Sequence, residues 1–244
     1  MRRVFSPQTE PPEWVMYDGY VPCPYLPEQT ARMPMRLPAR ALTREETARR
    51  LEMGDRRQGV FLYRPTCPAC RACEALRLPV AEFRASRTQR RVFRRGEELI
   101  ETQIAAPEVD PERVRLFNRH KLERDLLIGD ELLDHEGYER FLVESCVESI
   151  ELRYRVGGRL IGVAVSDVAA DSLSAVYCYF DPDFERLSPG TFSILKQVDL
   201  CARWGLRYLY LGLYVGACAS VAYKANYFPH ERLIGGRWER FEKR

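Results

Sequence analysis

Apolar stretches in the C-terminal half of the chain alternate with turn residues at short intervals. Three of them cover residues 150–156, 160–168 and 173–180, with Gly157-Gly158 and a turn around Asp171 between them. Short apolar runs bounded by such turns are typical of strands, so the pattern predicts an antiparallel meander. A helix over about 191–204, ended by Gly205, and a strand over 206–211 follow, which together predict the return crossover of an α/β layer.

The N-terminal half has a different pattern. Proline occurs eight times in residues 1–40, which argues against helices and central strands and predicts an irregular packed segment. Thr43 and Glu46 have the spacing of a capping box and predict a helix over 44–53. Strands are expected over 60–63 and 76–80, and Asp110 followed by Pro111 predicts another helix start. We place a domain boundary near residue 105, giving regions 1–105 and 106–244.

Composition narrows the class of protein. The 244 residues are 45% hydrophobic, which fits one large or two small globular domains and excludes disordered, collagen-like and repeat architectures. The net charge is only +3, but 34 of the 38 basic residues are arginines, the side chain suited to bidentate phosphate or carboxylate contacts. A GC-rich genome explains this bias equally well. Without a secretory signal or a run of about 20 apolar residues, we expect a soluble cytoplasmic protein with reduced thiols.

Half of the eight cysteines form a candidate metal site. Cys67, Cys70 and Cys73 follow one another at three-residue intervals, and Cys23 lies far upstream. Four thiolates suit a tetrahedral soft-metal site, so a structural zinc ion or an iron-sulfur cluster is chemically admissible. Free or redox-active thiols are an equally weighted alternative, because the sequence has no second C-x-x-C pair. The remaining cysteines lie in apolar segments and are expected in the core: Cys146, Cys178, Cys201 and Cys218.

A basic stripe is the second candidate site. Six arginines recur at or near helical spacing with one acidic neighbour, Glu82: Arg84, Arg87, Arg90, Arg91, Arg94 and Arg95. Such a face fits a phosphate backbone, with salt-dependent affinity and little base readout. An ordinary solvated helix face is the alternative, although like charges this close repel one another. We favour an anionic partner.

No established catalytic motif is present. The sequence has no catalytic triad, phosphate-binding Walker loop or dinucleotide fingerprint, and its three histidines lack metal spacing. The turn over 186–191 places Gly190 and hydroxyl groups at a helix start, which suits an anion. On that evidence alone an acyl-CoA N-acetyltransferase is possible, although the Gly-rich pyrophosphate loop of those enzymes is missing.

Several motifs in order along nearly the whole chain resemble one family. They are Cys-Pro-Tyr-Leu-Pro-Glu over 23–28, Phe-Leu-Tyr-Arg-Pro over 61–65, Ser-Arg-Thr-Gln-Arg-Arg over 86–91, Tyr-Phe-Asp-Pro over 179–182, Tyr-Leu-Tyr-Leu-Gly over 208–212, and Tyr223-Lys224. This set resembles the aminoacyl-tRNA protein transferases, in particular the bacterial aspartate/glutamate leucyltransferases. The resemblance implies an α+β fold: a GNAT-like acyltransferase domain preceded by a smaller cysteine-containing N-terminal domain.

The resemblance also implies the reaction. Members transfer Leu, or Arg in the eukaryotic branch, from its tRNA to the α-amine of a protein that begins with Asp or Glu, which marks it for N-degron degradation. We expect Leu-tRNA as the donor and Arg-tRNA as the alternative within the family. A CoA-dependent acetyltransferase and a non-catalytic RNA- or metal-binding protein are the alternatives outside it. No membrane partner is expected, and the oligomeric state stays open.

The chemistry of that reaction suggests roles for specific residues. An aminoacyl ester is already activated and an α-amine with a pKa near 8 is partly neutral, so positioning should dominate, with no covalent nucleophile and no cofactor required. An arginine fork would hold the acceptor carboxylate, with Arg64 and Arg77 as candidates. Asp181 and Tyr177 could orient the amine, with Tyr210 near the acyl group. Lys224 and the basic stripe would bind the tRNA acceptor arm.

Overall fold

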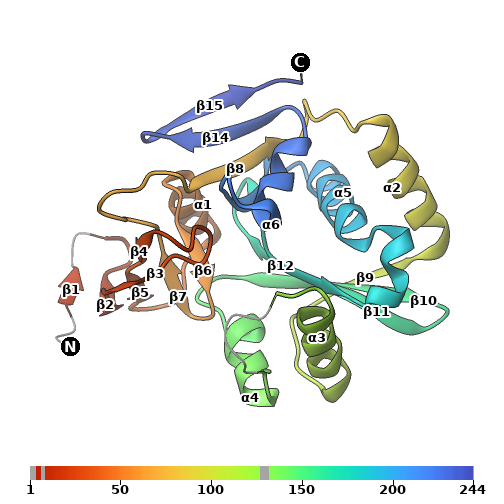
Figure 1. The fold of residues 1–244 in the computed structure, drawn as a ribbon, viewed down its shortest axis with the longest axis horizontal. Coiled ribbons are helices and arrows are strands. Elements are labelled where there is room, and N and C mark those ends of the chain that lie inside the picture. Colours follow the sequence, from red (N-terminus) through yellow and green to blue (C-terminus); the bar gives the residue numbers. More distant parts are fainter. Residues whose placement is uncertain (1–3, 7–8, 127–131, 244) are drawn as a thin grey trace.

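The computed structural model describes residues 4–6, 9–126 and 132–243, and it builds them into two main sheets and a set of covering helices (Figure 1). The larger sheet has eight strands in the order β15-β14-β8-β13-β12-β11-β10-β9. Its strands are β8 (Glu74–Pro79), β9 (Glu101–Ala105), β10 (Ser149–Val156), β11 (Arg159–Val168), β12 (Ser172–Phe180), β13 (Tyr208–Tyr214), β14 (His230–Ile234) and β15 (Arg237–Phe241).

The predicted meander is the centre of this sheet. Strands β10, β11 and β12 pair antiparallel in sequence order. Helix α5 (Pro189–Arg203) then returns the chain so that β13 lies parallel to β12. Both the meander and the crossover are therefore confirmed, with helix and strand bounds within a few residues of the predicted ones.

Helices cover both faces of the eight-stranded sheet (Figure 1). Helices α2 (Arg87–Leu99) and α5 pack on one face. Helix α3 (Pro111–Glu123) and the short α4 (His135–Tyr138), continued by the π-helical turn η1 (Glu139–Val143), pack on the other. None of the helices in the described part of the chain is both long and apolar enough to cross a bilayer.

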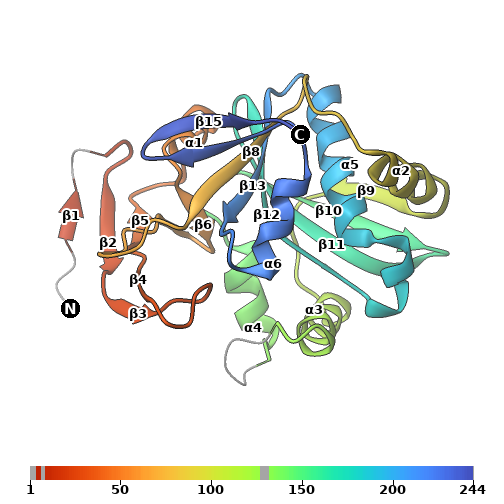
Figure 2. The ribbon, with the colours of Figure 1, turned by 45° about the horizontal axis from the view of Figure 1, so that its top comes forward.

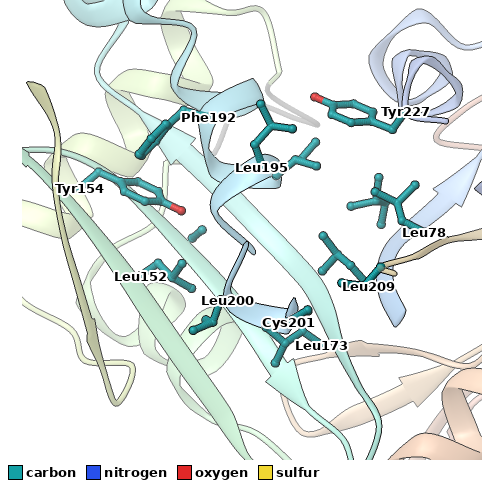
Figure 3. Packing of buried hydrophobic residues seen from close by; sticks show 14 of the residues in the cluster. Leu78, Leu152, Tyr154, Leu173, Phe192, Leu195, Leu200, Cys201, Leu209 and Tyr227 are labelled. Carbon is teal, nitrogen blue, oxygen red and sulfur yellow. The ribbon is translucent and has the colours of Figure 1, made fainter. Parts of the chain in front are cut away.

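Side chains under α5 form the main core (Figure 3). Leu152 and Tyr154 of β10, Leu173 of β12 and Leu209 of β13 belong to one cluster with Phe192 of α5, all with almost no exposed surface. The Tyr154 hydroxyl donates to Ser193 Oγ at 2.9 Å, so the polar atom of this buried ring is satisfied. This core fixes α5 on β10, β12 and β13.

The N-terminal region forms its own sheet at one end of the molecule (Figure 1). Its five strands have the order β1-β2-β5-β7-β6, and β3 and β4 form a separate pair. The bounds are β1 (Val4–Ser6), β2 (Glu13–Tyr17), β3 (Tyr20–Pro22), β4 (Thr30–Arg32), β5 (Met35–Pro38), β6 (Arg56–Gln58) and β7 (Phe61–Tyr63). The expectation of an irregular segment over 1–40 is therefore wrong. Pro22 and Pro38 stand at strand ends, where a missing N–H removes little pairing.

Helix α1 (Arg44–Glu52) confirms the predicted helix and its cap. Thr43 accepts a hydrogen bond from the Glu46 N–H, and the Glu46 carboxylate accepts one from the Thr43 N–H. Helix α2 begins with the same reciprocal arrangement, between Ser86 and Gln89. These caps satisfy backbone donors that have no partner inside the helix.

Strands from the N-terminal region belong to the large sheet. Strand β8 lies between β13 and β14, and β9 forms the edge beside β10. The mixture of α and β structure is confirmed, whereas the domain boundary near residue 105 and a separate cysteine-containing domain stay predictions. The chain passes from the five-stranded sheet to the eight-stranded sheet between β7 and β8, within the cysteine-rich segment.

Candidate functional site

Two neighbouring parallel strands diverge in the middle of the large sheet. Strands β12 and β13 pair only from Ser172 opposite Tyr208 to Ser174 opposite Tyr210. Beyond that point β12 continues along β11 to Phe180, while β13 continues along β8 to Tyr214. We call the place where β12 and β13 separate the opening. Helix α6 (Ala219–Ala222) and the 3-10 turn η3 (Tyr223–Asn226) lie against β13 next to it (Figure 2).

A glycine bulge in β13 accompanies the divergence. The register of β13 against β8 shifts between Tyr210 and Gly212, and Gly212 has a φ of +87°. A Cβ atom on Gly212 would lie 3.1 Å from Arg56 Nη2 and 3.3 Å from Lys224 Nζ. Glycine therefore provides both the left-handed backbone and the room for two cationic side chains.

Each cation is fastened to one of the diverging strands. Arg56, from β6 of the small sheet, donates from Nη1 to Ser174 Oγ at 3.0 Å and from Nη2 to the Ala175 carbonyl at 2.9 Å, both on β12. Lys224, from η3, donates to the Leu213 carbonyl of β13 at 2.8 Å. The two charges thus lie beside the place where the two strands separate.

These two cations lack a carboxylate partner. Within the described residues no Asp or Glu oxygen lies within 4.0 Å of Arg56 or Lys224, although Arg56 is only 7% exposed. Asp167, a carboxylate that acts on Arg56 from beyond ion-pair distance, accepts a hydrogen bond from Arg57 Nε at 2.8 Å. Burial lowers the pKa of Arg56, and burial together with the Arg56 guanidinium lowers the pKa of Lys224 to about 7. A buried cation without a counter-charge is costly, so the buried Arg56 with the half-buried Lys224 beside it indicates a site for an anionic group.

The three residues predicted to act in catalysis lie in different surroundings. Tyr177 packs against Phe117 of α3, with ring centroids 5.4 Å apart, and its burial raises its pKa to about 12. Asp181 is buried at the end of β12 and pairs with Arg119 at 2.8 Å and with Arg159. Tyr210 is buried, and its hydroxyl accepts from Arg77 at 3.0 Å. Their catalytic roles stay predictions.

The two arginines predicted to bind the acceptor already have carboxylate partners. Arg77 is 6% exposed, donates to Glu231 at 2.7 Å, contacts Glu52 and stacks on the Trp238 ring at 4.0 Å. Arg64, which is more exposed, donates to the buried Asp55 at 2.9 Å. Both stay predicted acceptor contacts, but each would have to exchange a partner within the protein for the substrate.

The basic stripe is an exposed surface beside the opening. Arg87, Arg90, Arg91, Arg94 and Arg95 lie on α2, Arg84 precedes it, and all six are exposed. None of the six forms an ion pair with a described Asp or Glu. The Gln89 side chain donates to the Asn226 carbonyl at 3.3 Å, and the Arg84 N–H to the Phe228 carbonyl at 2.9 Å. These bonds join α2 to the segment that carries Lys224.

The four cysteines predicted to form a metal site gather around one cavity. Cys23, Cys67, Cys70 and Cys73 line a cavity of about 500 Å³ between the β3–β4 pair with the cysteine-rich segment and the turn of the β14–β15 hairpin. The backbone nitrogens of Arg32 and Ala72 lie 3.5 Å from the sulfurs of Cys67 and Cys70. Burial and the three neighbouring thiols raise the pKa of Cys73 to about 12. Even so, among the described residues no three Cys, His, Asp or Glu side chains are placed to hold one ion.

Three of the remaining thiols lie in the core or against it as expected, whereas Cys218 belongs to none of the described core clusters. Cys146 and Cys201 are buried, Cys178 and Cys218 are half-buried, and all eight cysteines are free thiols. His120 is buried against Phe180, where it accepts from the backbone N–H at 3.2 Å, and burial lowers its pKa to about 4.

Sequence reasoning missed Arg56 and the role of Gly212. Arg56 stands in a three-residue strand next to Arg57, and no periodicity distinguishes the two. Gly212 ends the Tyr-Leu-Tyr-Leu-Gly motif, so a glycine within an apolar strand was the available signal for a bulge or a close approach.

Comparison with known proteins identifies the family. The family models described as arginine-tRNA-protein transferase, N terminus and C terminus, match residues 21–91 and 112–234. A Chromobacterium violaceum protein named aspartate/glutamate leucyltransferase is 37% identical over 218 residues, covering 89% of this chain and 90% of the relative. A protein of the same name from Aeromonas salmonicida is also 37% identical, over 229 residues, covering 90% and 92%.

Solved structures resemble the chain more distantly. A crystal structure of FemX has a TM-score of 0.45 at 8% identity and covers 80% of this chain and 79% of its own. The C-terminal domain of a putative lysylphosphatidylglycerol synthetase from Agrobacterium fabrum has a TM-score of 0.47 at 14% identity, covering 59% and 47%. Neither score assigns the fold, but the sequence matches extend over most of the chain, which therefore belongs to the arginine-tRNA-protein transferase family.

Proposed function

We propose that this chain transfers leucine from Leu-tRNA to the α-amine of proteins that begin with Asp or Glu, and that transfer takes place between β12 and β13. The family relationship and the name of its relatives support the reaction. One observation carries the location: parallel strands that diverge beside the buried Arg56 and the half-buried Lys224, neither of which has a described carboxylate partner. The proposal includes a GNAT-like catalytic domain, to which a diverging parallel pair next to a crossover helix is well suited.

The reaction needs little beyond positioning. The neutral α-amine attacks the ester carbonyl, a tetrahedral oxyanion forms, and the ribose oxygen of the tRNA leaves with a proton as the new amide bond is made. Holding the amine about 3 Å from the ester carbon and donating hydrogen bonds to the oxyanion lower the barrier by several kcal/mol. Tyr177, Asp181 and Tyr210 stay candidates for orienting the amine. No acyl-enzyme is required.

The exposed arginines of α2 would bind the acceptor arm of the tRNA. Arginine guanidinium groups pair well with phosphate oxygens, and this face is joined to η3 beside the opening. The 3′ end could then enter between the strands while the duplex stays on α2. A reaction that consumes charged tRNA belongs in the cytoplasm, and its product would carry an N-degron.

Parallel donor assays test this function. We expect label from Leu-tRNA on peptides beginning with Asp or Glu and none on an Ala peptide. Label from Arg-tRNA instead would mean that the chain catalyses the same transfer with Arg-tRNA as the donor. Transfer from acetyl-CoA alone, or RNA binding without transfer to any peptide, would contradict the proposal.

We also propose a structural metal at the four cysteines. The donor set suits a soft ion, because Cys23, Cys67, Cys70 and Cys73 share one cavity and two sulfurs already receive backbone N–H groups. A bound cation would stabilise the thiolates and reverse the repulsion that raises the pKa of Cys73. The metal would fix the chain between the two sheets, with no part in the chemistry.

Metal analysis of the purified protein tests this site. We expect a zinc ion or an iron-sulfur cluster, distinguished by visible absorbance, that is lost in Cys70→Ser and kept in Cys146→Ala, whose thiol lies in a different cluster. A chelator should lower the Tm of the wild type more than that of Cys70→Ser. Protein that is folded, active and metal-free would contradict the site.

A further inference from the structure

Arg56 and Lys224, the two cations at the opening, have no carboxylate partner among the described residues, and the transfer mechanism above gives them no role. Arg56 and Lys224 approach one point above Gly212 from opposite strands. We propose that they bind the side-chain carboxylate of the acceptor's first residue and so determine the preference for Asp and Glu. This inference rests on the proposed function and adds the residues that recognise the acceptor.

The donors fit a carboxylate. Within the described residues the Arg56 guanidinium makes two hydrogen bonds and the Lys224 ammonium makes one, whereas they have five and three N–H groups to offer. A carboxylate above Gly212 could therefore accept from both cations at once, and the missing Cβ lets it approach closely. Arg56 is rigidly held on β12, while the flexible lysine could follow either an Asp or a Glu side chain.

The surroundings leave the positive charge uncompensated. The groups that can act on Arg56 with negative charge are Tyr63, Asp167 and Tyr25. Burial raises the pKa of both tyrosine hydroxyls, so they are neutral near pH 7, and the Asp167 carboxylate accepts a hydrogen bond from Arg57. Cys218 is the other titratable group that acts on Lys224 besides Arg56. An acceptor without a carboxylate would leave the buried Arg56 and the half-buried Lys224 without a counter-charge, which is how a site rejects an analogue lacking a polar group.

Other anions of the reaction fit this site less well. Phosphates of the tRNA have six exposed, unpaired arginines available on and next to α2, whereas Arg56 is 7% exposed. The candidates named from the sequence, Arg64 and Arg77, already pair with Asp55 and with Glu231 and Glu52. Lys224, named there for tRNA, lies where the carboxylate would bind.

Acceptor selectivity tests the proposal. The measured quantity is the ratio of kcat/KM for a peptide beginning with Asp to that for the same peptide beginning with Asn. We expect Lys224→Met to lower this ratio at least about tenfold and to leave the KM for Leu-tRNA unchanged. Lys224→Glu should favour a Lys-initiated peptide over the Asp peptide. Lys121→Met, a half-buried lysine on α3, is the matched control and should keep the wild-type ratio.

Three outcomes would overturn it. An equal loss with Asp and Asn peptides would mean that Lys224 acts on the oxyanion. A rise only in the KM for Leu-tRNA would mean that Lys224 binds a phosphate group of the tRNA. A loss of the Asp/Asn ratio in Arg77→Gln but not in Lys224→Met would mean that Arg77 binds the carboxylate.

A wild type that transfers leucine to no peptide would instead reject the proposed function. If Lys224→Met loses transfer altogether, binding of the Asp and Asn peptides to this variant, measured by calorimetry, decides in its place: equal affinities support the proposal, and a wild-type preference for the Asp peptide rejects it.

The pH dependence of binding gives a second readout. The suitable ligand is a malyl peptide, in which a hydroxyl replaces the acceptor's α-amine, so that no ligand group titrates near pH 7. Free Lys224 has a pKa of about 7, and a bound carboxylate stabilises its charged form. Binding is therefore strongest below pH 7, and KI should rise up to about tenfold from pH 7 to 8. In Lys224→Arg the KI should not change with pH, and a wild-type KI without pH dependence would contradict the assignment.

Discussion

Replacing Gly212 by alanine should lower kcat/KM for leucyl transfer to an Asp-initiated peptide by about tenfold, because a misplacement near 1 Å at a positioning site costs about 100-fold and the shift of the two cations is smaller. The added Cβ would come within 3.1 Å of Arg56 Nη2 and 3.3 Å of Lys224 Nζ, so the two cations must move apart. The φ of +87° also becomes strained, at a cost of about 1–3 kcal/mol in the free energy of unfolding.

A second glycine separates the effect on the site from the effect of strain. Gly158 has a φ of +80° in the β10–β11 hairpin, and its Cβ would meet no atom within 4 Å. Gly158→Ala should therefore lose a similar amount of stability, read from denaturant unfolding, and keep wild-type transfer. If Gly212→Ala is folded and transfers leucine as fast as Gly158→Ala, the opening beside Gly212 is not the reaction site.

Removing two charges from α2 should weaken the use of Leu-tRNA strongly. In the double variant Arg87→Gln and Arg91→Gln, we expect KM for Leu-tRNA to rise at least about tenfold at moderate salt. Each phosphate contact contributes about 1 to the slope of log affinity against log salt, so the slope should fall by about 2. The KM for the acceptor peptide should not change, because α2 carries the duplex and not the acceptor.

Two exposed arginines elsewhere provide the matched control. Arg115 on α3 and Arg237 on β15 are exposed and form no ion pair with a described carboxylate. Their double replacement by glutamine changes the net charge equally. A rise in KM for Leu-tRNA as large in this control as in the α2 variant would mean that the effect follows net charge and not the basic face.

Local sequence signals predicted the turns and helix starts that depend on residues close together in the sequence. The turns around 157–158 and 171 delimit the meander, and Thr43 with Glu46 fixes the start of α1. The arginine spacing likewise marked the exposed face of α2, whose capping box lies in the quoted motif over 86–91. In each case the residues that decide the structure lie within a few positions of one another.

Long-range pairing could not be predicted in the same way. Strand β8 is apolar and buried along most of its length, so its sequence predicts a strand but not that β13 and β14 are its neighbours. Arg56 reaches Ala175, 119 positions away, and no local pattern encodes that contact. Of the cations at the opening, only Lys224 was singled out, and that came from a resemblance.

The position of the bound leucyl group tests most directly whether transfer takes place between β12 and β13. Transfer tRNA charged with a photoreactive, diazirine-bearing leucine can be bound to the protein, irradiated and mapped by peptide mass spectrometry. We expect cross-links confined to residues where the strands separate: on β12 beyond Ser174, on β13 from Gly212, or on η3. Cross-links concentrated at the cysteine-lined cavity or on the α3 face of the sheet would contradict this location.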